Sequence, residues 1–120
     1  MSDTATTIPT RALVNGVEMP VLGYGVFQTP PEETVRCVRE ALEGGYRMID
    51  TAQSYANEEG VGAGLRDSGL AREDVFLTTK IAPVNLTQER AAASIDESLR
   101  LLGTDYIDLM LLHQAMGDYP

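Results

Sequence analysis

The chain opens with a hydrophobic pattern that is typical of strands. Asn15-Gly16 stands between the two apolar arms of residues 12–19 and predicts a β-hairpin with a two-residue type I′ turn, in which both central residues take positive φ. The next apolar run, residues 21–23, predicts a short buried strand, and residues 24–28 are the loop after it. The chain is therefore expected to enter its main sheet from a hairpin.

Three segments with the apolar spacing of helices follow, and a run of strand-forming residues comes after each of them. The predicted helices cover residues 30–43, 57–67 and 87–102, and the predicted strands cover residues 46–50, 75–79 and 106–112. Thr29 is predicted to cap the first helix. The second helix contains three glycines, which predict that it packs closely on a sheet: Gly60, Gly62 and Gly64. The last strand is nearly all apolar, as expected where both faces are covered.

The alternation of strands and helices predicts an α/β fold with a parallel sheet and right-handed crossovers. A length of 120 residues allows one domain. Residues 1–11 are mostly polar, and we expect a disordered or weakly ordered tail there, with the folded domain over residues 12–120. This tail has neither the cationic start nor the apolar centre of a signal peptide, so we expect a cytoplasmic location.

Charge and composition argue against several classes of function. The chain has 9 Lys+Arg and 18 Asp+Glu, and its net charge of -9 disfavours binding to nucleic acid or to an anionic membrane. No apolar run approaches the ~20 residues that span a bilayer. One cysteine, Cys37, cannot form an internal disulfide, and one histidine, His113, cannot supply a motif that needs two, so no metal site is predicted.

Polar residues recur where the predicted strands end. The residues at or just beyond these ends are, in chain order, Tyr24 and Gly25, Asp50, Lys80, and His113. Tyr55 follows in the loop after Asp50. Because parallel α/β folds bind ligands outside the carboxyl ends of their strands, we expect these side chains to share one site.

The types of side chain in this set suggest proton delivery. The Tyr55 phenol is a weak acid near neutral pH, and a neighbouring Lys80 ammonium would favour loss of its proton. Asp50 can hold Lys80 in place, and His113 can orient a substrate oxygen by a hydrogen bond. Such a set can protonate a carbonyl oxygen, but none of its members can give a hydride, so a cofactor is required.

Each of these residues also has a structural explanation when it is taken alone. Asp50 can cap a turn, Tyr55 can pack with its hydroxyl in water, and Lys80 can be a solvated charge. His113 can be a structural histidine with satisfied hydrogen bonds. Their joint occurrence at successive strand ends favours a catalytic site. A small nucleotide-binding protein is less favoured, because the Gly-x-Gly run that begins at Gly23 lacks the third glycine of the dinucleotide fingerprint.

Taken together, these segments resemble the aldo-keto reductase family. The matching stretches are residues 19–28, 45–52, Tyr55 with Asn57-Glu58, 61–62, 79–80, 98–109 and 111–114. The ending His113-Gln114, followed by residues 117–119, resembles the bacterial branch near the 2,5-diketo-D-gluconate reductases. The resemblance implies the N-terminal half of a (β/α)8 TIM barrel with an N-terminal β-hairpin. It also implies NADPH-dependent reduction of aldehydes and ketones to alcohols.

The resemblance also implies roles for individual residues. The catalytic residues are Asp50, Tyr55, Lys80 and His113, with Tyr55 as general acid, Lys80 and Asp50 tuning it, and His113 orienting the carbonyl. The cofactor-binding residues for NADPH are Gly25, Val26, Asp50 and His113. The substrate-binding residues for a small carbonyl compound are Phe27, His113 and Gln114.

The sequence ends just after the fourth expected barrel strand, whereas a complete barrel takes about 250 residues. The resemblance implies that much of the cofactor site lies on strands five to eight. We therefore expect the isolated chain to bind NADPH poorly and to be impaired or inactive. The alternative is a non-catalytic half-barrel that self-associates through its open sheet edges as a binding or assembly module.

Overall fold

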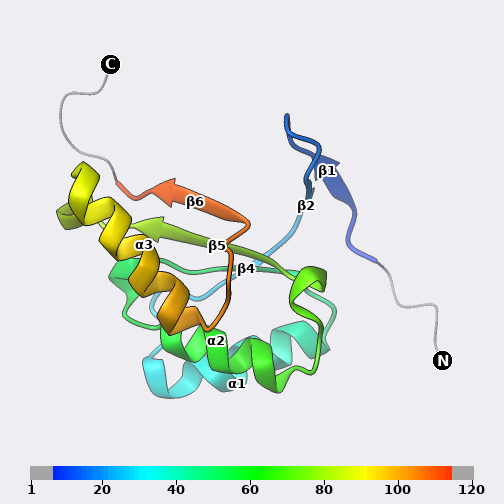
Figure 1. Ribbon diagram of the computed structural model, residues 1–120. Helices are drawn as coiled ribbons and strands as arrows, with labels where there is room; N and C mark the ends of the chain where they lie inside the picture. Colours follow the sequence, from blue (N-terminus) through cyan, green and yellow to red (C-terminus); the bar gives the residue numbers. More distant parts are fainter. Residues whose placement is uncertain (1–6, 115–120) are drawn as a thin grey trace.

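The computed structural model describes residues 7–114; residues 1–6 and 115–120 lie outside the described part (Figure 1). It begins with an antiparallel hairpin of β1 (Thr10–Ala12) and β2 (Glu18–Pro20). A 4-stranded parallel sheet follows in the order β3 (Tyr24–Gly25), β4 (Met48–Asp50), β5 (Phe76–Ile81) and β6 (Leu109–Leu112). β1 begins at Thr10, inside the segment that was expected to be a weakly ordered tail.

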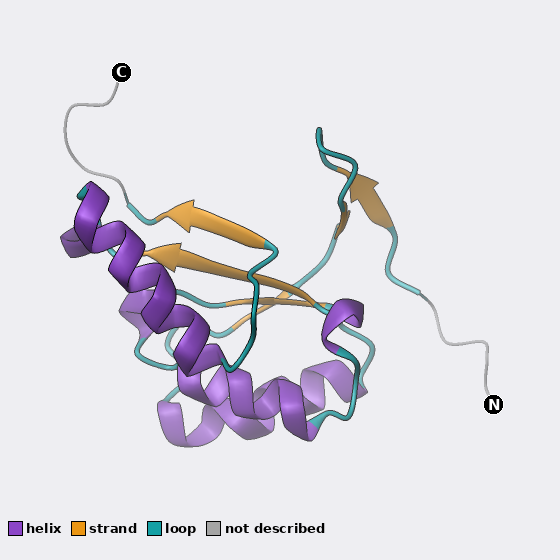
Figure 2. Cartoon of the chain, viewed as in Figure 1, coloured by secondary structure: helices purple, strands orange, loops and turns teal. Residues whose placement is uncertain are grey.

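Three α-helices connect the strands: α1 (Pro31–Glu43), α2 (Glu58–Asp67) and α3 (Gln88–Leu102). Short 3-10 helices stand at the connections: η1 (Gln53–Tyr55), η2 (Arg72–Asp74) and η3 (Pro83–Asn85). The long helices lie together on one side of the sheet, and the hairpin stands apart from them (Figures 1 and 2). Alternating parallel strands and helices confirm the predicted α/β class.

The core lies between the sheet and these helices. Deeply buried apolar side chains come from the loop after β3 and from α1, β4, α2, β5 and α3: Val26, Val38, Leu42, Ile49, Val61, Leu77 and Leu102. β6 is different, because its Leu111 and Leu112 are 40% and 61% exposed. The prediction that both faces of this strand are covered is therefore wrong for the described residues.

The hairpin turn differs from the predicted type I′ turn. The N–H of Gly16 donates to Leu13 O and the N–H of Leu13 donates to Val17 O, both at 2.8 Å, so three residues form the loop. Within it Gly16 has a φ of 85°, whereas Asn15 does not take positive φ. Its side chain instead accepts a hydrogen bond from Val17 N–H at 3.1 Å. These features are typical of a type I turn with a glycine bulge, which needs only one residue of positive φ.

The first strand of the main sheet also starts later than predicted. Val21 and Leu22 are 54% and 53% exposed, and the N–H of Val21 donates to Pro9 O beside the hairpin. Sheet pairing begins at Tyr24, opposite Ile49. The apolar run of residues 21–23 therefore extends the hairpin, and part of the predicted loop forms the strand.

Two details of the helices correct the sequence predictions. The N-cap of α1 is Pro30, whose side chain carries no hydrogen-bond acceptor, so the helix has no side-chain cap. Thr29 therefore does not cap it. The glycines of α2 pack on helices rather than on the sheet: a Cβ at Gly60 or Gly64 would meet α1, and a Cβ at Gly62 would meet the backbone at the end of α3.

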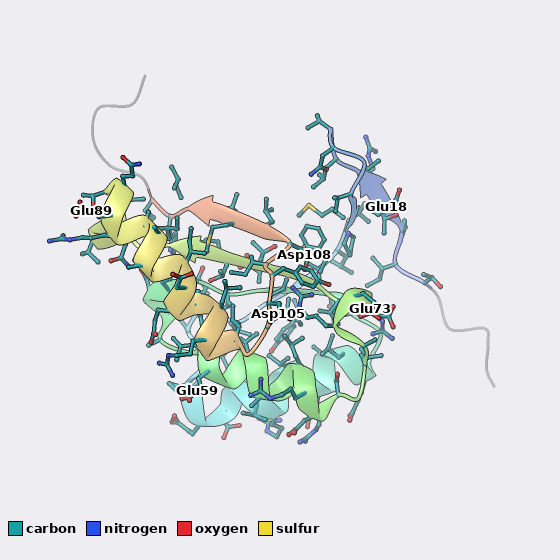
Figure 3. All side chains as sticks on the ribbon, viewed as in Figure 1. Glu18, Glu59, Glu73, Glu89, Asp105 and Asp108 are labelled. Atoms are coloured by element: carbon teal, nitrogen blue, oxygen red, sulfur yellow. The ribbon has the colours of Figure 1, made fainter. Side chains whose placement is uncertain are left out.

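The amino ends of β5 and β6 are joined through one arginine. Arg72 pairs with Asp108 at 2.8 Å, and the same Asp108 oxygen accepts the Leu77 N–H at 2.8 Å. Arg72 also donates to Thr104 and lies 4.0 Å from the centroid of the Tyr106 ring. Asp108 lies where the chain enters β6 (Figure 3). These contacts fix the sheet at the end opposite the polar cluster described next.

Candidate active site

The structure brings the four predicted catalytic residues together. Asp50 is the last residue of β4, Lys80 is the residue before the last of β5, and His113 follows β6 directly. Tyr55 ends η1, the short helix after β4. Because β4, β5 and β6 are parallel neighbours, their carboxyl ends meet at the same edge of the sheet. This geometry is why residues 63 positions apart in the sequence share one site.

Lys80 is the centre of the cluster. Its Nζ donates to both carboxylate oxygens of Asp50 at 2.9 Å and to Thr51 O at 2.9 Å. A fourth contact reaches the Tyr55 hydroxyl at 3.4 Å. The Lys80 side chain is only 14% exposed, whereas Asp50 is 33% exposed. The recessed ammonium is therefore in contact with both a carboxylate and a phenol oxygen.

Aromatic rings flank Tyr55 on two sides. The Phe27 ring lies 5.2 Å away at 49°, and the His113 ring lies 5.6 Å away at 84°. The Lys80 Nζ is 5.0 Å from the Tyr55 ring centroid. Phe27 is 66% exposed, so it presents an apolar surface beside the phenol.

His113 has an unused polar atom in the cluster. Its main-chain N–H donates to Ile81 O at 3.0 Å, which continues the β5–β6 pairing beyond the strand. Its Nδ1 is buried and has no hydrogen-bond partner among residues 7–114. Gln114, the next residue, is exposed and has a positive φ of 48°.

The predicted cofactor residues fall into two groups. Gly25 is exposed, and a Cβ there would lie 3.7 Å from Asp50 Oδ2, so the glycine leaves this carboxylate open on that side. Val26 has a different place, because its side chain is fully buried in the core. Its N–H donates to Asp50 O at 3.1 Å, and its O accepts from Thr29 N–H at 2.9 Å. Both main-chain polar groups of Val26 are thus paired within the chain.

Sequence reasoning missed the buried polar residues behind this cluster. Thr51, Asn57 and Glu58 are 0%, 2% and 4% exposed. Asn57 begins the second predicted helix, yet its side chain makes no cap hydrogen bond. It instead contacts Thr51 and the loop after β3. The only signal in the sequence is a polar pair, Asn57-Glu58, before the apolar face of that helix.

Comparison with known proteins assigns the family. The sequence model described as the Aldo/keto reductase family matches residues 19–120. The chain belongs to the aldo-keto reductase family. It is 50% identical over 111 residues to morphine 6-dehydrogenase from Pseudomonas putida, an alignment that covers 92% of this chain and 38% of that protein.

Solved structures of aldo-keto reductases share the fold. A crystal structure of a protein provisionally named 2,5-diketo-D-gluconic acid reductase B has a TM-score of 0.86 and 43% identity, with 97% of this chain and 41% of that chain covered. A Bombyx mori aldo-keto reductase in complex with NADP has a TM-score of 0.85 and 34% identity, with 90% and 38% covered. These matches confirm the family resemblance, its 2,5-diketo-D-gluconate reductase-like branch and the predicted fold, a part of a (β/α)8 barrel.

The chain spans about two fifths of the length of the relatives it matches. Within residues 7–114, no helix is long and apolar enough to cross a membrane. The same residues contain no group of three or more His, Cys, Asp or Glu side chains placed to hold a metal ion.

Proposed function

We propose that this chain carries the proton-delivery site of an NADPH-dependent reductase of aldehydes and ketones. The observation that supports this most strongly is the Lys80 ammonium, which contacts the Asp50 carboxylate at 2.9 Å and the Tyr55 hydroxyl at 3.4 Å. Membership of the aldo-keto reductase family supports the same reaction class, since relatives carry the names of reductases and dehydrogenases.

In this proposal Tyr55 is the general acid. The phenol proton moves from Tyr55 Oη to the carbonyl oxygen of the substrate, which becomes the hydroxyl of the alcohol. The Lys80 ammonium stabilises the phenolate that remains, and Asp50 holds Lys80 in place through two hydrogen bonds. The His113 imidazole, whose ring lies 5.6 Å from the Tyr55 ring, orients the carbonyl oxygen.

A nicotinamide cofactor would supply the hydride when bound, because none of the residues in the cluster can give one. The residues present fit one end of such a cofactor. Gly25 leaves Asp50 Oδ2 open, and a partly exposed carboxylate can accept hydrogen bonds from a sugar hydroxyl. We therefore assign Gly25, Asp50 and His113 to cofactor binding, and Phe27, His113 and Gln114 to a carbonyl substrate. The Bombyx mori relative in complex with NADP supports NADPH.

Replacement of the acid tests this function. Tyr55→Phe is expected to lower kcat for reduction of a small aldehyde by about 10²–10⁴-fold, because it removes the proton donor. The Kd for NADPH should change by less than about two-fold, since the ring remains. The assay applies to the 120-residue chain and to this chain completed with the C-terminal half of a family relative. Tyr106→Phe, at the amino ends of the strands, is the matched control. Turnover that survives Tyr55→Phe would show that Tyr55 is not the acid.

A second candidate applies to the 120-residue chain by itself, namely self-association as a half-barrel. Leu111 and Leu112 are exposed on β6, and the sheet has four strands, half of the eight whose side chains fill a small barrel. Two copies paired edge to edge would supply eight. Mass in solution, recorded during an NADPH titration, tests this: a discrete dimer is expected, and Leu112→Lys should convert it to a monomer. Val14→Lys, in the exposed hairpin turn, is the control. A monomer in the unmodified chain contradicts this candidate.

A further inference from the structure

Asn57 is a buried amide that contacts three separate parts of the chain. Its Oδ1 accepts a hydrogen bond from Thr51 Oγ1 at 2.8 Å. Its Nδ2 donates to Val26 O at 3.0 Å and to Thr29 O at 3.2 Å. The side chain is at the start of α2 and is 2% exposed. Asn57 thus joins the loop after β3, the loop after β4 and the beginning of α2.

Both loops that Asn57 joins touch the catalytic cluster. The loop after β4 contains Thr51, whose carbonyl oxygen accepts a hydrogen bond from Lys80 Nζ at 2.9 Å. The loop after β3 contains Phe27, whose ring packs on the Tyr55 ring at 5.2 Å. The amide of Asn57 is therefore connected to the ammonium through Thr51, and to the Tyr55 ring through Val26 and its neighbour Phe27.

Other hydrogen bonds leave the loop after β3 dependent on this amide, whereas the loop after β4 is also held by Gln53, which accepts from Ala82 N–H and donates to Ser94 O. Thr51 N–H donates to Thr78 O at 2.9 Å and Val26 N–H donates to Asp50 O at 3.1 Å, so the strand ends are held by the sheet. Within residues 7–114, the other partner of Val26 O is the N–H of Thr29 in the same loop, at 2.9 Å. Among the described residues no other side chain donates to Val26 O or Thr29 O except a weak contact of Thr34 with Thr29 O at 3.5 Å.

From this arrangement we infer that Asn57 is a positioning residue for the Lys80–Tyr55 pair. It holds in place the residue whose carbonyl oxygen accepts the Lys80 hydrogen bond, Thr51, and the loop whose Phe27 ring packs on Tyr55. It contacts neither catalytic side chain. The inference rests on the proposed function, because it concerns the same cluster. Its test uses the position of Lys80 rather than turnover, so the two can fail separately.

Lys80 offers a direct measurement, because it is the only lysine in the sequence. An amine-labelling reagent therefore has one side-chain target besides the chain's amino terminus, and mass spectrometry of peptides separates the two. In the native chain four acceptors surround Nζ, which is 14% exposed, so labelling should be slow. Labelling needs an opening of the cluster, and its rate reports how often that opening occurs.

The expected result for Asn57→Ala is labelling of Lys80 about ten-fold faster than in the unmodified chain. The substitution removes three hydrogen bonds and leaves two carbonyls without this donor, a loss sufficient for a change of that size. Thr104→Val is the control for general loss of stability, because Thr104 makes its hydrogen bonds with Arg72 and Tyr106 O at the other end of the sheet. For each variant, labelling is measured at the temperature at which its free energy of unfolding, determined with urea, equals that of the others.

Thr51→Val tests the same inference with a smaller change. It keeps the shape of the side chain and the carbonyl that receives Lys80, and it removes the hydrogen bond to Asn57. It should increase the labelling rate in the same direction, by less than Asn57→Ala. If Asn57→Ala does not fold, the labelling rate of Lys80 in Thr51→Val alone tests the inference. Labelling of Asn57→Ala or Thr51→Val at the rate of the stability-matched Thr104→Val variant would overturn the inference.

Discussion

The substitution Gly62→Ala sets helix propensity against packing. Alanine is favoured over glycine in a helix by about 1 kcal/mol, so propensity alone predicts a stabilised chain. The structure predicts the opposite. A Cβ at this position would lie 2.7 Å from Leu102 C and 2.9 Å from Leu102 Cα, and closer still to the Leu102 carbonyl oxygen. These are backbone atoms at the end of α3, which cannot rotate away as a side chain can.

The magnitude follows from the missing space. Ordinary contacts begin at 3.4 Å, so α2 and the end of α3 must separate by about 0.7 Å or more. Leu102 and Gly62 are both buried, so this movement opens the core around Val61 and Leu65. Overpacking of this kind costs about 1–3 kcal/mol, and a backbone contact falls at the upper end of that range. After the propensity gain, the free energy of unfolding should fall by about 1–2 kcal/mol.

Urea unfolding followed by circular dichroism measures this difference. Ala63→Gly, at the next and half-buried position of α2, is the matched control and should lower the free energy of unfolding by about 1 kcal/mol through propensity. Both substitutions should therefore destabilise the chain, although they change the glycine content in opposite directions. A Gly62→Ala variant that is more stable than the unmodified chain would refute the close approach of α2 to α3.

Two further predictions concern the sheet ends and alkaline pH. Asp108→Asn should lower the free energy of unfolding, measured with urea, by about 1–3 kcal/mol. Arg72 and Asp108 are only 21% and 17% exposed, so the substitution leaves a recessed guanidinium without its carboxylate. An unchanged free energy of unfolding would contradict this prediction. Burial, and after it the Cys37 thiol, raise the pKa of Tyr24, so the unfolded chain loses this phenol proton first as pH rises. The free energy of unfolding linked to Tyr24 is fully present below about pH 10 and falls above it. In urea unfolding at increasing pH, Tyr24→Phe should therefore lose less free energy of unfolding above about pH 10 than the unmodified chain.

The sequence predicts the types of the elements well where periodicity is strong, and less well where a local signal has two solutions. Strand and helix alternation gives the parallel sheet because each helix carries the chain back to the start of the next strand, which then runs in the same direction. Asn15-Gly16 is compatible with two turns, and the structure uses the one that requires positive φ at Gly16 alone. The apolar pair Val21 and Leu22 resembles a buried strand, but burial depends on which segment lies opposite, and here the hairpin continues instead.

The candidate site shows the same division. Asp50, Lys80 and His113 could be placed together from the sequence because each stands at the end of a parallel strand. Asn57 could not, because its partners Val26 and Thr29 lie 31 and 28 residues earlier in the chain, and no local pattern marks such a contact. From the sequence, an asparagine at the start of a helix predicts a side chain that caps the helix N-terminus. Only the folded structure shows that the amide serves the neighbouring loops.

In the proposed function, the contacts of the cluster separate the geometry of the acid from the affinity for the cofactor. Every contact of Lys80 Nζ described above is made by Asp50, Thr51 or Tyr55, so the geometry of the acid is set by β4, η1 and β5. In the proposed function, cofactor affinity depends on more than this, because Gly25, Asp50 and the His113 ring would contact one end of a dinucleotide. Protection of Lys80 from labelling and the Kd for NADPH therefore measure different parts of the machinery. A chain with slow labelling of Lys80 and weak NADPH binding would have a positioned acid and an incomplete site for the hydride donor. Fusion of this chain to the C-terminal half of a family relative should then change the Kd for NADPH far more than the labelling rate of Lys80.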